Sequence, residues 1–240
     1  MQQLRDNTFL SIVIPIYNEE RRILPTLQKI VQFIRANNIE CQMVVVDDGS
    51  QDRSLSIIQD FFGSDYHLKV IQGRPNRGKG WAVQQGMLAA AGEWIIFMDA
   101  DLSVPVETLN LFLKKIKEGW DIVIGSRRVP GAQITQRQPY LREQLGKQFT
   151  KISNLILGTQ FKDFTCGFKL FKKEAARLLF TDQQLWNWSF DSEILFLAKK
   201  RGLKIVEYPV QWTNSKDTKV QLFKDIPASF WGLLKIRYLH

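Results

Sequence analysis

Short apolar runs rich in β-branched residues alternate with helix-like segments through the first 125 residues, and this alternation constrains the fold more than any other feature. Unbroken apolar runs are typical of strands that are buried on both faces of a sheet. Single helices between successive strands favour right-handed crossovers and parallel strands. We therefore predict an α/β fold with strands at 9–17, 41–48, 68–72, 94–99 and 121–126, and helices at 19–36, 52–62, 78–91 and 105–118.

The second half of the chain is organised differently. We predict helices at 138–157 and 190–200, strands at 167–171 and 203–209, and a closing amphipathic segment at 222–239. No low-complexity linker and no internal repeat separates the two halves. The expected organisation is one domain over residues 1–240 with a C-terminal amphipathic helical elaboration.

Composition limits where such a chain is expected to work. Two cysteines allow at most one disulfide, which favours a reducing compartment. No uncharged apolar run approaches the about 18 to 20 residues needed to cross a bilayer, and the first ten residues lack the apolar stretch of a signal peptide. We expect an intracellular protein that is soluble or bound at a membrane surface.

The positive charge of the chain lies in one half. Residues 1–125 contain 13 Lys and Arg against 15 Asp and Glu, whereas residues 126–240 contain 20 against 9. Such asymmetry favours a polyanionic partner for the second half, namely phosphate groups, an anionic membrane or nucleic acid. A merely solubilising surface is the alternative.

Four carboxylates fall at the ends of two predicted strands. Asp47 and Asp48 follow one apolar run, and Asp99 and Asp101 follow another. Ligands of parallel sheets bind at the carboxyl ends of the strands, so one pocket would collect these acids. Oxygen ligands in an Asp-x-Asp pattern suit Mg²⁺ or Mn²⁺. The alternative for this pair is capping of the following helix.

Two further segments suit a nucleotide. Asp47 or Asp48 would accept hydrogen bonds from a base or ribose, and Gly49 would allow close backbone approach. The segment NRGKG at 76–80 places glycines and two cations at a helix N-terminus, where a diphosphate would bind. For the first segment taken alone, a turn with a helix cap is the alternative.

In their order along the chain, PIYNEE, VVVDDGS, NRGKG and FMDADLS resemble the motifs of the family 2 glycosyltransferases, which have the GT-A fold, a Rossmann-like and mostly parallel sheet flanked by helices. Downstream, FKDFTCGFKLF and the segment 188–212 are similar to the branch that uses polyprenyl phosphates, and most of all to dolichyl-phosphate β-glucosyltransferases. The resemblance implies a nucleotide-sugar half at 1–125 and an acceptor and membrane-facing half at 126–240.

The resemblance also implies roles for individual residues. Asp99, Asp101 and Asp163 would be catalytic, and Asp101 with Ser103 would hold Mg²⁺ or Mn²⁺. Ser103 stands where some relatives carry a Gln that completes the metal site. The residues expected to line the nucleotide-sugar pocket are Pro15, Tyr17, Glu19, Asp47, Asp48, Arg77, Lys79, Asp99, Ala100, Asp101 and Asp191.

The acceptor side rests on a few charged residues. Asp163 would position or neutralise rather than act as a strong base, because a phosphate acceptor is already ionised at neutral pH. Arg127, Arg128 and Arg137 would bind the acceptor phosphate, and solvated loop charges are the alternative for Arg127 and Arg128. Asp191 would lie near the donor sugar or cap a helix.

The closing segment mixes basic with apolar and aromatic residues. This composition fits insertion at a bilayer interface, and packing of a helix on the core is the alternative. The residues that carry the pattern are Lys219, Phe223, Lys224, Ile226, Phe230, Trp231, Leu234, Lys235, Arg237 and Leu239. We expect a peripheral protein at the cytoplasmic face of a membrane.

The predicted reaction is inverting, metal-dependent transfer of a hexose, glucose from UDP-glucose, to a polyprenyl or dolichyl monophosphate. A GDP-mannose-dependent polyprenyl-phosphate mannosyltransferase is the alternative. A polysaccharide synthase is disfavoured, because the chain has no QxxRW-type motif. Nucleic acid is not an expected partner, because the acids cluster where a polyanion would be repelled and the basic half contains no known binding module.

Overall fold

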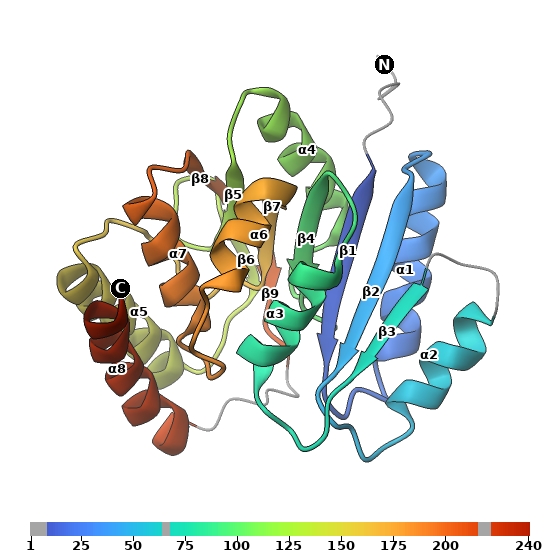
Figure 1. Cartoon of the computed structure of the whole chain (residues 1–240), viewed down its shortest axis with the longest axis horizontal. Coiled ribbons are helices and arrows are strands. Elements are labelled where there is room, and N and C mark those ends of the chain that lie inside the picture. Colours follow the sequence, from blue (N-terminus) through green and yellow to red (C-terminus); the bar gives the residue numbers. More distant parts are fainter. Residues whose placement is uncertain (1–8, 64–67, 216–221) are drawn as a thin grey trace.

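The computed structural model describes residues 9–63, 68–215 and 222–240 and has a seven-stranded sheet at its centre (Figure 1). The strand order is β3-β2-β1-β4-β7-β5-β8. The strands are β1 (Leu10–Ile16), β2 (Cys41–Asp47), β3 (Leu68–Gln72), β4 (Trp94–Met98), β5 (Ile122–Ser126), β7 (Phe168–Lys172) and β8 (Ile205–Pro209). All neighbouring pairs except the two that involve β7 are parallel, so the predicted fold class is confirmed.

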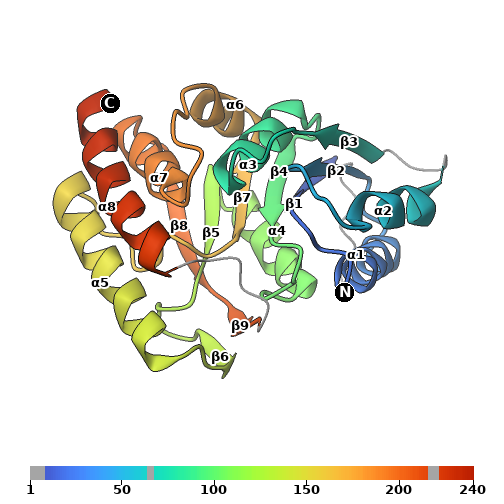
Figure 2. The same cartoon turned by 90° about the horizontal axis from the view of Figure 1, so that it is seen from below.

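Helices cover both faces of the sheet (Figures 1 and 2). One apolar core lies between the sheet and α3, α6 and α7, and a second lies on the opposite face under α1, α2 and α4. This explains why the central strands are apolar without alternation. The helices are α1 (Ile23–Ala36), α2 (Ser54–Phe62), α3 (Lys79–Ala89), η1 (Val106–Thr108), α4 (Leu109–Lys117), α5 (Tyr140–Leu157), α6 (Lys173–Thr181), α7 (Phe190–Lys200) and α8 (Leu222–Leu239).

Strand β7 is inserted antiparallel between β4 and β5, a placement that the sequence pattern did not predict. Trp94 pairs with Lys172 and Met98 with Phe168, so the start of β7 lies beside the end of β4. The Asp99 N–H donates to the Gly167 carbonyl at 3.1 Å. The segment before β7 is thereby held against the acidic residues that follow β4.

Three further elements were not predicted. Helix α6 follows β7 directly, and the short strands β6 (Gln133–Gln136) and β9 (Gln211–Thr213) form a separate parallel pair. Within the described segments, no helix is both long enough and apolar enough to span a membrane.

The closing helix α8 packs beside α5 and α7 (Figure 2). Leu233 and Ile236 are fully buried in the core, while Trp231 and Tyr238 are 63% and 90% exposed. The helix therefore has a core-facing side, as the packing alternative required, and an outer side that carries aromatic residues. Of the expected interface residues, Lys219 and the side chains of Phe223, Lys224 and Ile226 lie outside the described part of the chain.

Candidate active site

The loop after β2 and the turn before α3 are joined by one buried carboxylate. Asp48 accepts hydrogen bonds from the N–H groups of Arg77 at 2.8 Å and Gly78 at 2.7 Å. Burial raises the pKa of Asp48, and these two N–H groups offset part of that effect. Asp47 is also buried and accepts the Ser50 N–H at 2.9 Å. Asp48 thus shapes the turn that begins α3, and Arg77 stays exposed at its rim.

The loop after β1 reaches the acid pair through Arg22, which the sequence analysis did not identify. Glu19 is buried and forms an ion pair with Arg22, whose Nη2 lies 2.7 Å from Glu19 Oε1. The Nη1 atom of the same guanidinium lies 3.9 Å from Asp101 Oδ2. Pro15 and Tyr17 are half-buried at the end of β1. Glu19 therefore holds the Arg22 guanidinium near Asp101.

The acid pair follows β4, and its two carboxylates have different neighbours. Asp99 Oδ1 lies 2.5 Å from the Nζ atom of Lys79, the first residue of α3. Asp101 Oδ1 accepts the Ser103 N–H at 2.9 Å, which closes a local turn. The Ala100 carbonyl accepts a hydrogen bond from the Thr26 hydroxyl at 2.6 Å. Neither acid caps the following helix, because no side chain caps η1 or α4.

Asp191 lies in the core at the start of α7. Its carboxylate is 2.5 Å from the Nζ atom of Lys169 on β7, which the sequence analysis also missed. Burial raises the pKa of Asp191, against the opposing effects of Lys169 and Lys79. Asp191 is therefore brought to the same charged cluster as Lys79 and Asp99.

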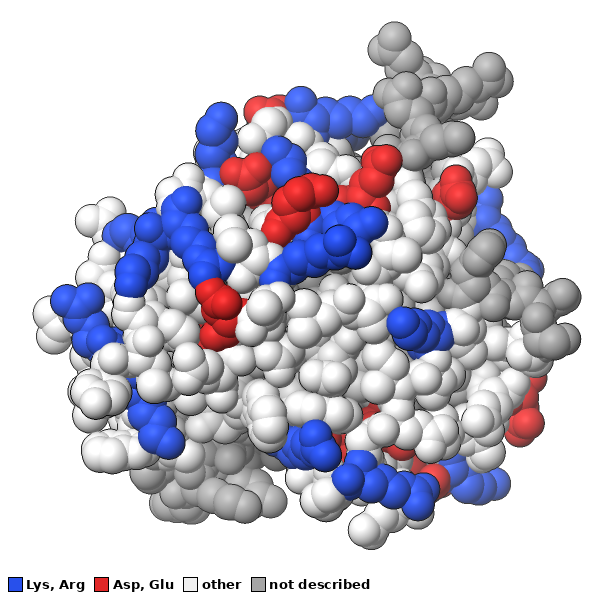
Figure 3. Space-filling model, viewed as in Figure 1, with Lys and Arg blue, Asp and Glu red and all other residues white. Residues whose placement is uncertain are grey.

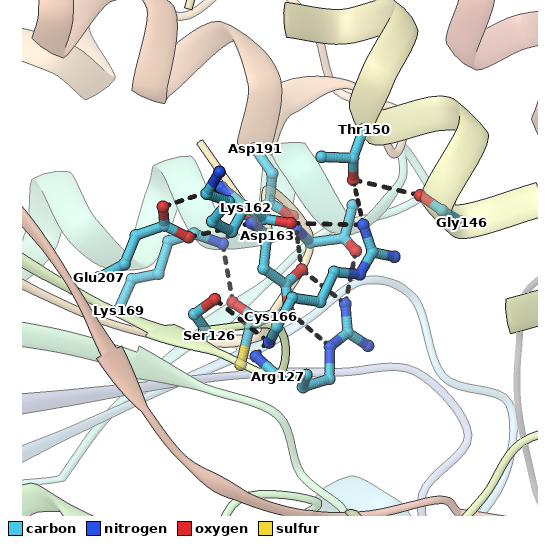
Figure 4. A network of polar contacts seen from close by, with 12 residues as sticks. Ser126, Arg127, Gly146, Thr150, Lys162, Asp163, Cys166, Lys169, Asp191 and Glu207 are labelled. Carbon is cyan, nitrogen blue, oxygen red and sulfur yellow. Dashed lines mark hydrogen bonds and ion pairs between the residues drawn. The ribbon is translucent and has the colours of Figure 1, made fainter. Parts of the chain in front are cut away.

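The residues expected to serve the acceptor are only partly brought together (Figure 4). Asp163 is fully buried and paired with Arg127, whose Nε and Nη2 atoms donate to its two oxygens at 2.7 Å each. The Arg127 N–H donates to the same carboxylate at 3.0 Å. Burial would raise the pKa of Asp163, but the Arg127 guanidinium holds that pKa well below its usual range. Asp163 therefore orients Arg127 and is ionised at neutral pH.

Arg128 and Arg137 lie differently from Arg127. Arg128 donates from Nη1 to the Thr150 hydroxyl on α5 and to the Lys162 carbonyl at 3.4 Å. Burial lowers the pKa of Arg128, and Asp163 partly offsets this effect. Arg137 is exposed in the loop between β6 and α5. The guanidinium of Arg127 also lies 5.3 Å from the ring of Trp212 on β9.

A small cavity opens beside the acid pair. It lies between the end of β4, the start of β7 and β9, so the inserted strand forms one of its walls. The lining residues are Met98, Asp99, Leu102, Ser103, Val104, Gly167, Phe168 and Trp212.

The donor atoms at the acid pair suit a metal shared with a substrate. Within the described residues, no group of three or more His, Cys, Asp and Glu side chains is placed to hold a metal ion. Mg²⁺ and Mn²⁺ in phosphate-handling sites need only one or two carboxylates, because substrate oxygens and waters complete the coordination. The Asp101 side chain is 18% exposed, and Ser103 lies next to it. That Asp101 and Ser103 hold such an ion stays a prediction.

A mostly parallel sheet of this kind, with paired carboxylates after β4 and a glycine-rich, lysine-bearing helix start beside them, is the arrangement expected of a glycosyltransferase with the GT-A fold. Residues 11–180 match the glycosyl transferase family 2, and the chain belongs to this family.

Similar proteins agree with this assignment. The chain is 35% identical over 225 residues to a dolichyl-phosphate beta-glucosyltransferase of Trichomonas vaginalis, covering 89% of this chain and 66% of that protein. It is 34% identical over 242 residues to a dolichyl-phosphate beta-glucosyltransferase of Drosophila melanogaster, covering 95% and 72%. The chain thus spans about two thirds of the length of these relatives.

Solved structures show the same fold at lower identity. Glucosyl-3-phosphoglycerate synthase from Mycobacterium tuberculosis has a TM-score of 0.66 at 18% identity, covering 96% of this chain and 80% of that one. A complex of that enzyme with Mn²⁺, UDP-glucose and phosphoglyceric acid has a TM-score of 0.68 at 17% identity, with the same coverage.

Proposed function

We propose that this glycosyltransferase transfers glucose from UDP-glucose to dolichyl or polyprenyl phosphate, with Mg²⁺ or Mn²⁺ and with inversion at the anomeric carbon. The observation that carries the proposal is the 2.5 Å contact between Lys79 and Asp99, with Asp101 beside them, at the start of α3. Support for the sugar and the acceptor comes from the relatives, which are dolichyl-phosphate beta-glucosyltransferases.

The donor diphosphate would bind where α3 begins. Asp48 fixes the turn at Arg77 and Gly78, and the next residue, Lys79, begins α3 with its ammonium against Asp99. Glu19 orients Arg22, which adds a second cation near Asp101. Pro15, Tyr17 and Asp47 would line the base pocket, and Asp191 would lie near the sugar. A metal held by Asp101 and Ser103 would offset the charge that develops on the leaving UDP.

The acceptor phosphate would attack the donor directly. One of its oxygens forms the new bond to the anomeric carbon as the bond to UDP breaks, and the electron pair leaves with UDP. This single displacement inverts the configuration and needs no base, because the phosphate is already ionised. Asp163, ionised and paired, is suited to holding Arg127 in place rather than to accepting a proton.

Cations around Arg127 favour an anionic acceptor there. Arg127, Arg128 and Arg142 lie close enough to influence one another, and burial together with Arg127 lowers the pKa of Arg142. Asp163 compensates only one of these positive charges through a bidentate pair. Arg128 and Arg137, with Arg127 held by Asp163, are the groups we expect to bind the lipid phosphate.

The flank formed by α5 and α8 is suited to a membrane surface. Exposed apolar side chains on both helices include Tyr140 and Leu141 on α5 and Trp231 and Tyr238 on α8. On the face drawn in Figure 3, Lys and Arg side chains gather along the flank of α7, α8 and α5, with few acids among them. Aromatic and basic residues on one surface favour binding at an anionic bilayer interface. These residues support peripheral binding to a membrane, and we propose its cytoplasmic face as the location.

Titration calorimetry with UDP, UDP-glucose, GDP and GDP-mannose tests the donor. Each ligand is titrated with Mn²⁺ and with EDTA. We expect binding of the two uridine ligands that depends on Mn²⁺. A preference for the guanosine ligands would favour GDP-mannose as the donor. Equal affinities in EDTA and in Mn²⁺ would show that donor binding does not need a metal.

A further inference from the structure

A lysine is buried in the core directly beneath the candidate site. The side chains of Lys169 on β7 and Asp191 on α7 are only 1% and 4% exposed, and Nζ lies 2.5 Å from Oδ1. The same ammonium donates to the Cys166 carbonyl at 2.7 Å (Figure 4) and lies 5.3 Å from the Phe97 ring. Desolvating two charges costs about as much as their attraction returns, so an apolar pair would fill this space equally well. Packing alone does not account for the pair.

The buried pair is coupled to the lysine of the site. Burial alone would lower the pKa of Lys79, but Asp99 and then Asp191 raise it above its ordinary value. Asp191 in turn is acted on by two lysines, Lys169 and Lys79. The four side chains form an alternating series that runs from the core to the acid pair, in the order Lys169, Asp191, Lys79 and Asp99.

The order of the four charges determines which carboxylate pairs with the Lys79 ammonium. Lys79 has carboxylates on two sides, in direct contact with Asp99 and within electrostatic reach of Asp191. The Trp188 ring lies 5.5 Å from its Nζ atom and limits where the side chain can go. Without Lys169, Asp191 would be a buried carboxylate with Lys79 as its strongest remaining cation. Lys79 would then be drawn inward, away from Asp99.

We propose that Lys169 is a positioning residue. By pairing with Asp191 inside the core, Lys169 allows the Lys79 ammonium to stay paired with Asp99, where it is available to the donor diphosphate. The inference rests on the proposed function, because it takes the ligand of Lys79 to be a nucleoside diphosphate. Lys169 itself is too deeply buried to touch that ligand.

UDP binding and donor kinetics of five variants, three single and two double, test the proposal. Lys169→Met should weaken Mn²⁺-dependent UDP binding about tenfold, as expected when one charge-assisted contact is lost. It should raise KM for UDP-glucose and leave KM for the lipid acceptor unchanged. In the Lys79→Met background, Lys169→Met should have less than about a twofold further effect, because its action passes through Lys79. The double variant Lys169→Met with Asp191→Asn should bind UDP with the same affinity as the single variant Asp191→Asn.

A second lysine on the same strand provides a matched control. Lys172 pairs with Asp121 at 2.8 Å, and its side chain is 34% exposed. Lys172→Met removes an ion pair from β7 without touching the charged series, so UDP binding should stay unchanged. Thermal unfolding of every variant separates lost stability from lost binding. If Lys169→Met does not fold, Lys169→Gln replaces it, since its amide can donate to the Cys166 carbonyl without carrying a charge.

The outcomes distinguish the inference from the function on which it rests. If wild type does not bind UDP with Mn²⁺, the proposed function fails. If wild type binds but Lys169→Met binds equally well, or if the effects of Lys169→Met and Lys79→Met simply add, the positioning role is wrong and Lys169 serves only the core.

Discussion

Gly167 lies directly against the carboxylate of Asp99. A Cβ atom built on Gly167 would lie 2.0 Å from Asp99 Oδ2 and 2.4 Å from its Cγ, so any side chain at this position would force the Asp99 carboxylate to move. The Gly167 carbonyl also accepts the Asp99 N–H at 3.1 Å. The antiparallel insertion of β7 therefore both anchors the backbone of Asp99 and leaves room for its side chain.

Replacing this glycine should move the acid without unfolding the protein. In Gly167→Ala the new methyl group displaces the Asp99 carboxylate, which breaks its contact with Lys79. We expect kcat/KM for UDP-glucose to fall at least about tenfold, the equivalent of one lost ion-pair contact. Gly202→Ala is the control, because Gly202 precedes the edge strand β8, away from the end of β4, and has open space around it, although its φ is +68°. That variant should lose some stability and keep its turnover.

Asp101 is the residue we expect to hold the metal. Asp101→Asn keeps an oxygen that accepts the Ser103 N–H but removes the negative charge. Turnover should fall about a hundredfold or more, the loss typical of a group that stabilises developing charge. Calorimetry should show UDP binding that no longer differs between Mn²⁺ and EDTA. A variant whose UDP affinity still rises with Mn²⁺ as in wild type would exclude Asp101 as a ligand.

Arg127 should matter for stability as well as for the acceptor. Arg127→Met leaves the fully buried Asp163 without its bidentate partner, a change that costs about 3–5 kcal/mol. Arg137→Met removes an exposed charge and should change the free energy of unfolding by less than about 0.5 kcal/mol. Urea denaturation of both variants measures this difference. Equal stabilities with a raised KM for the lipid in Arg127→Met alone would mean that Arg127 serves the acceptor and not the fold.

The same buried pair gives a pH signature. Because the pKa of Asp163 is lower in the folded than in the unfolded state, its ionised form stabilises the fold at pH above about 3.9 and this contribution is lost as pH falls below that value. The difference in unfolding free energy between wild type and Asp163→Asn should be flat from about pH 8 to pH 5 and shrink below about pH 4. Urea denaturation across this range checks it. A difference that changes between pH 5 and 8 would contradict a lowered pKa.

Membrane binding should depend on the outer side of α8. Deleting the helix would also remove Leu233 and Ile236 from the core, so point changes are the better test. Trp231→Glu together with Tyr238→Glu should reduce binding to vesicles containing anionic lipid about tenfold or more, since it removes interfacial aromatic surface and adds repulsion. Leu111→Glu, on the exposed side of α4, is the control. Equal vesicle binding by all three proteins would show that α8 is not the docking surface.

The sequence predicted those parts of the fold that depend on local patterns. Apolar runs and helical spacing located the strands and helices of the first half, and the ends of those strands located Asp48, Asp99 and Asp101. The position of β7 was not predictable in this way, because a run of five residues does not specify which strands lie beside it or in which direction it runs. The same holds for the pairs Arg127–Asp163 and Lys169–Asp191, whose partners lie 36 and 22 residues apart. Such contacts depend on tertiary packing, which cannot be predicted from the spacing of apolar residues along the sequence.

The most direct test of the proposed function is a transfer assay with purified protein, UDP-glucose, dolichyl phosphate and Mn²⁺, followed by mass spectrometry and determination of the anomeric configuration. We predict formation of a β-linked dolichyl-phosphate glucose that disappears in EDTA and in Asp101→Asn. GDP-mannose should give no product under the same conditions. Mannosyl product alone, an α-linked glucoside, or full activity in EDTA would each contradict the account.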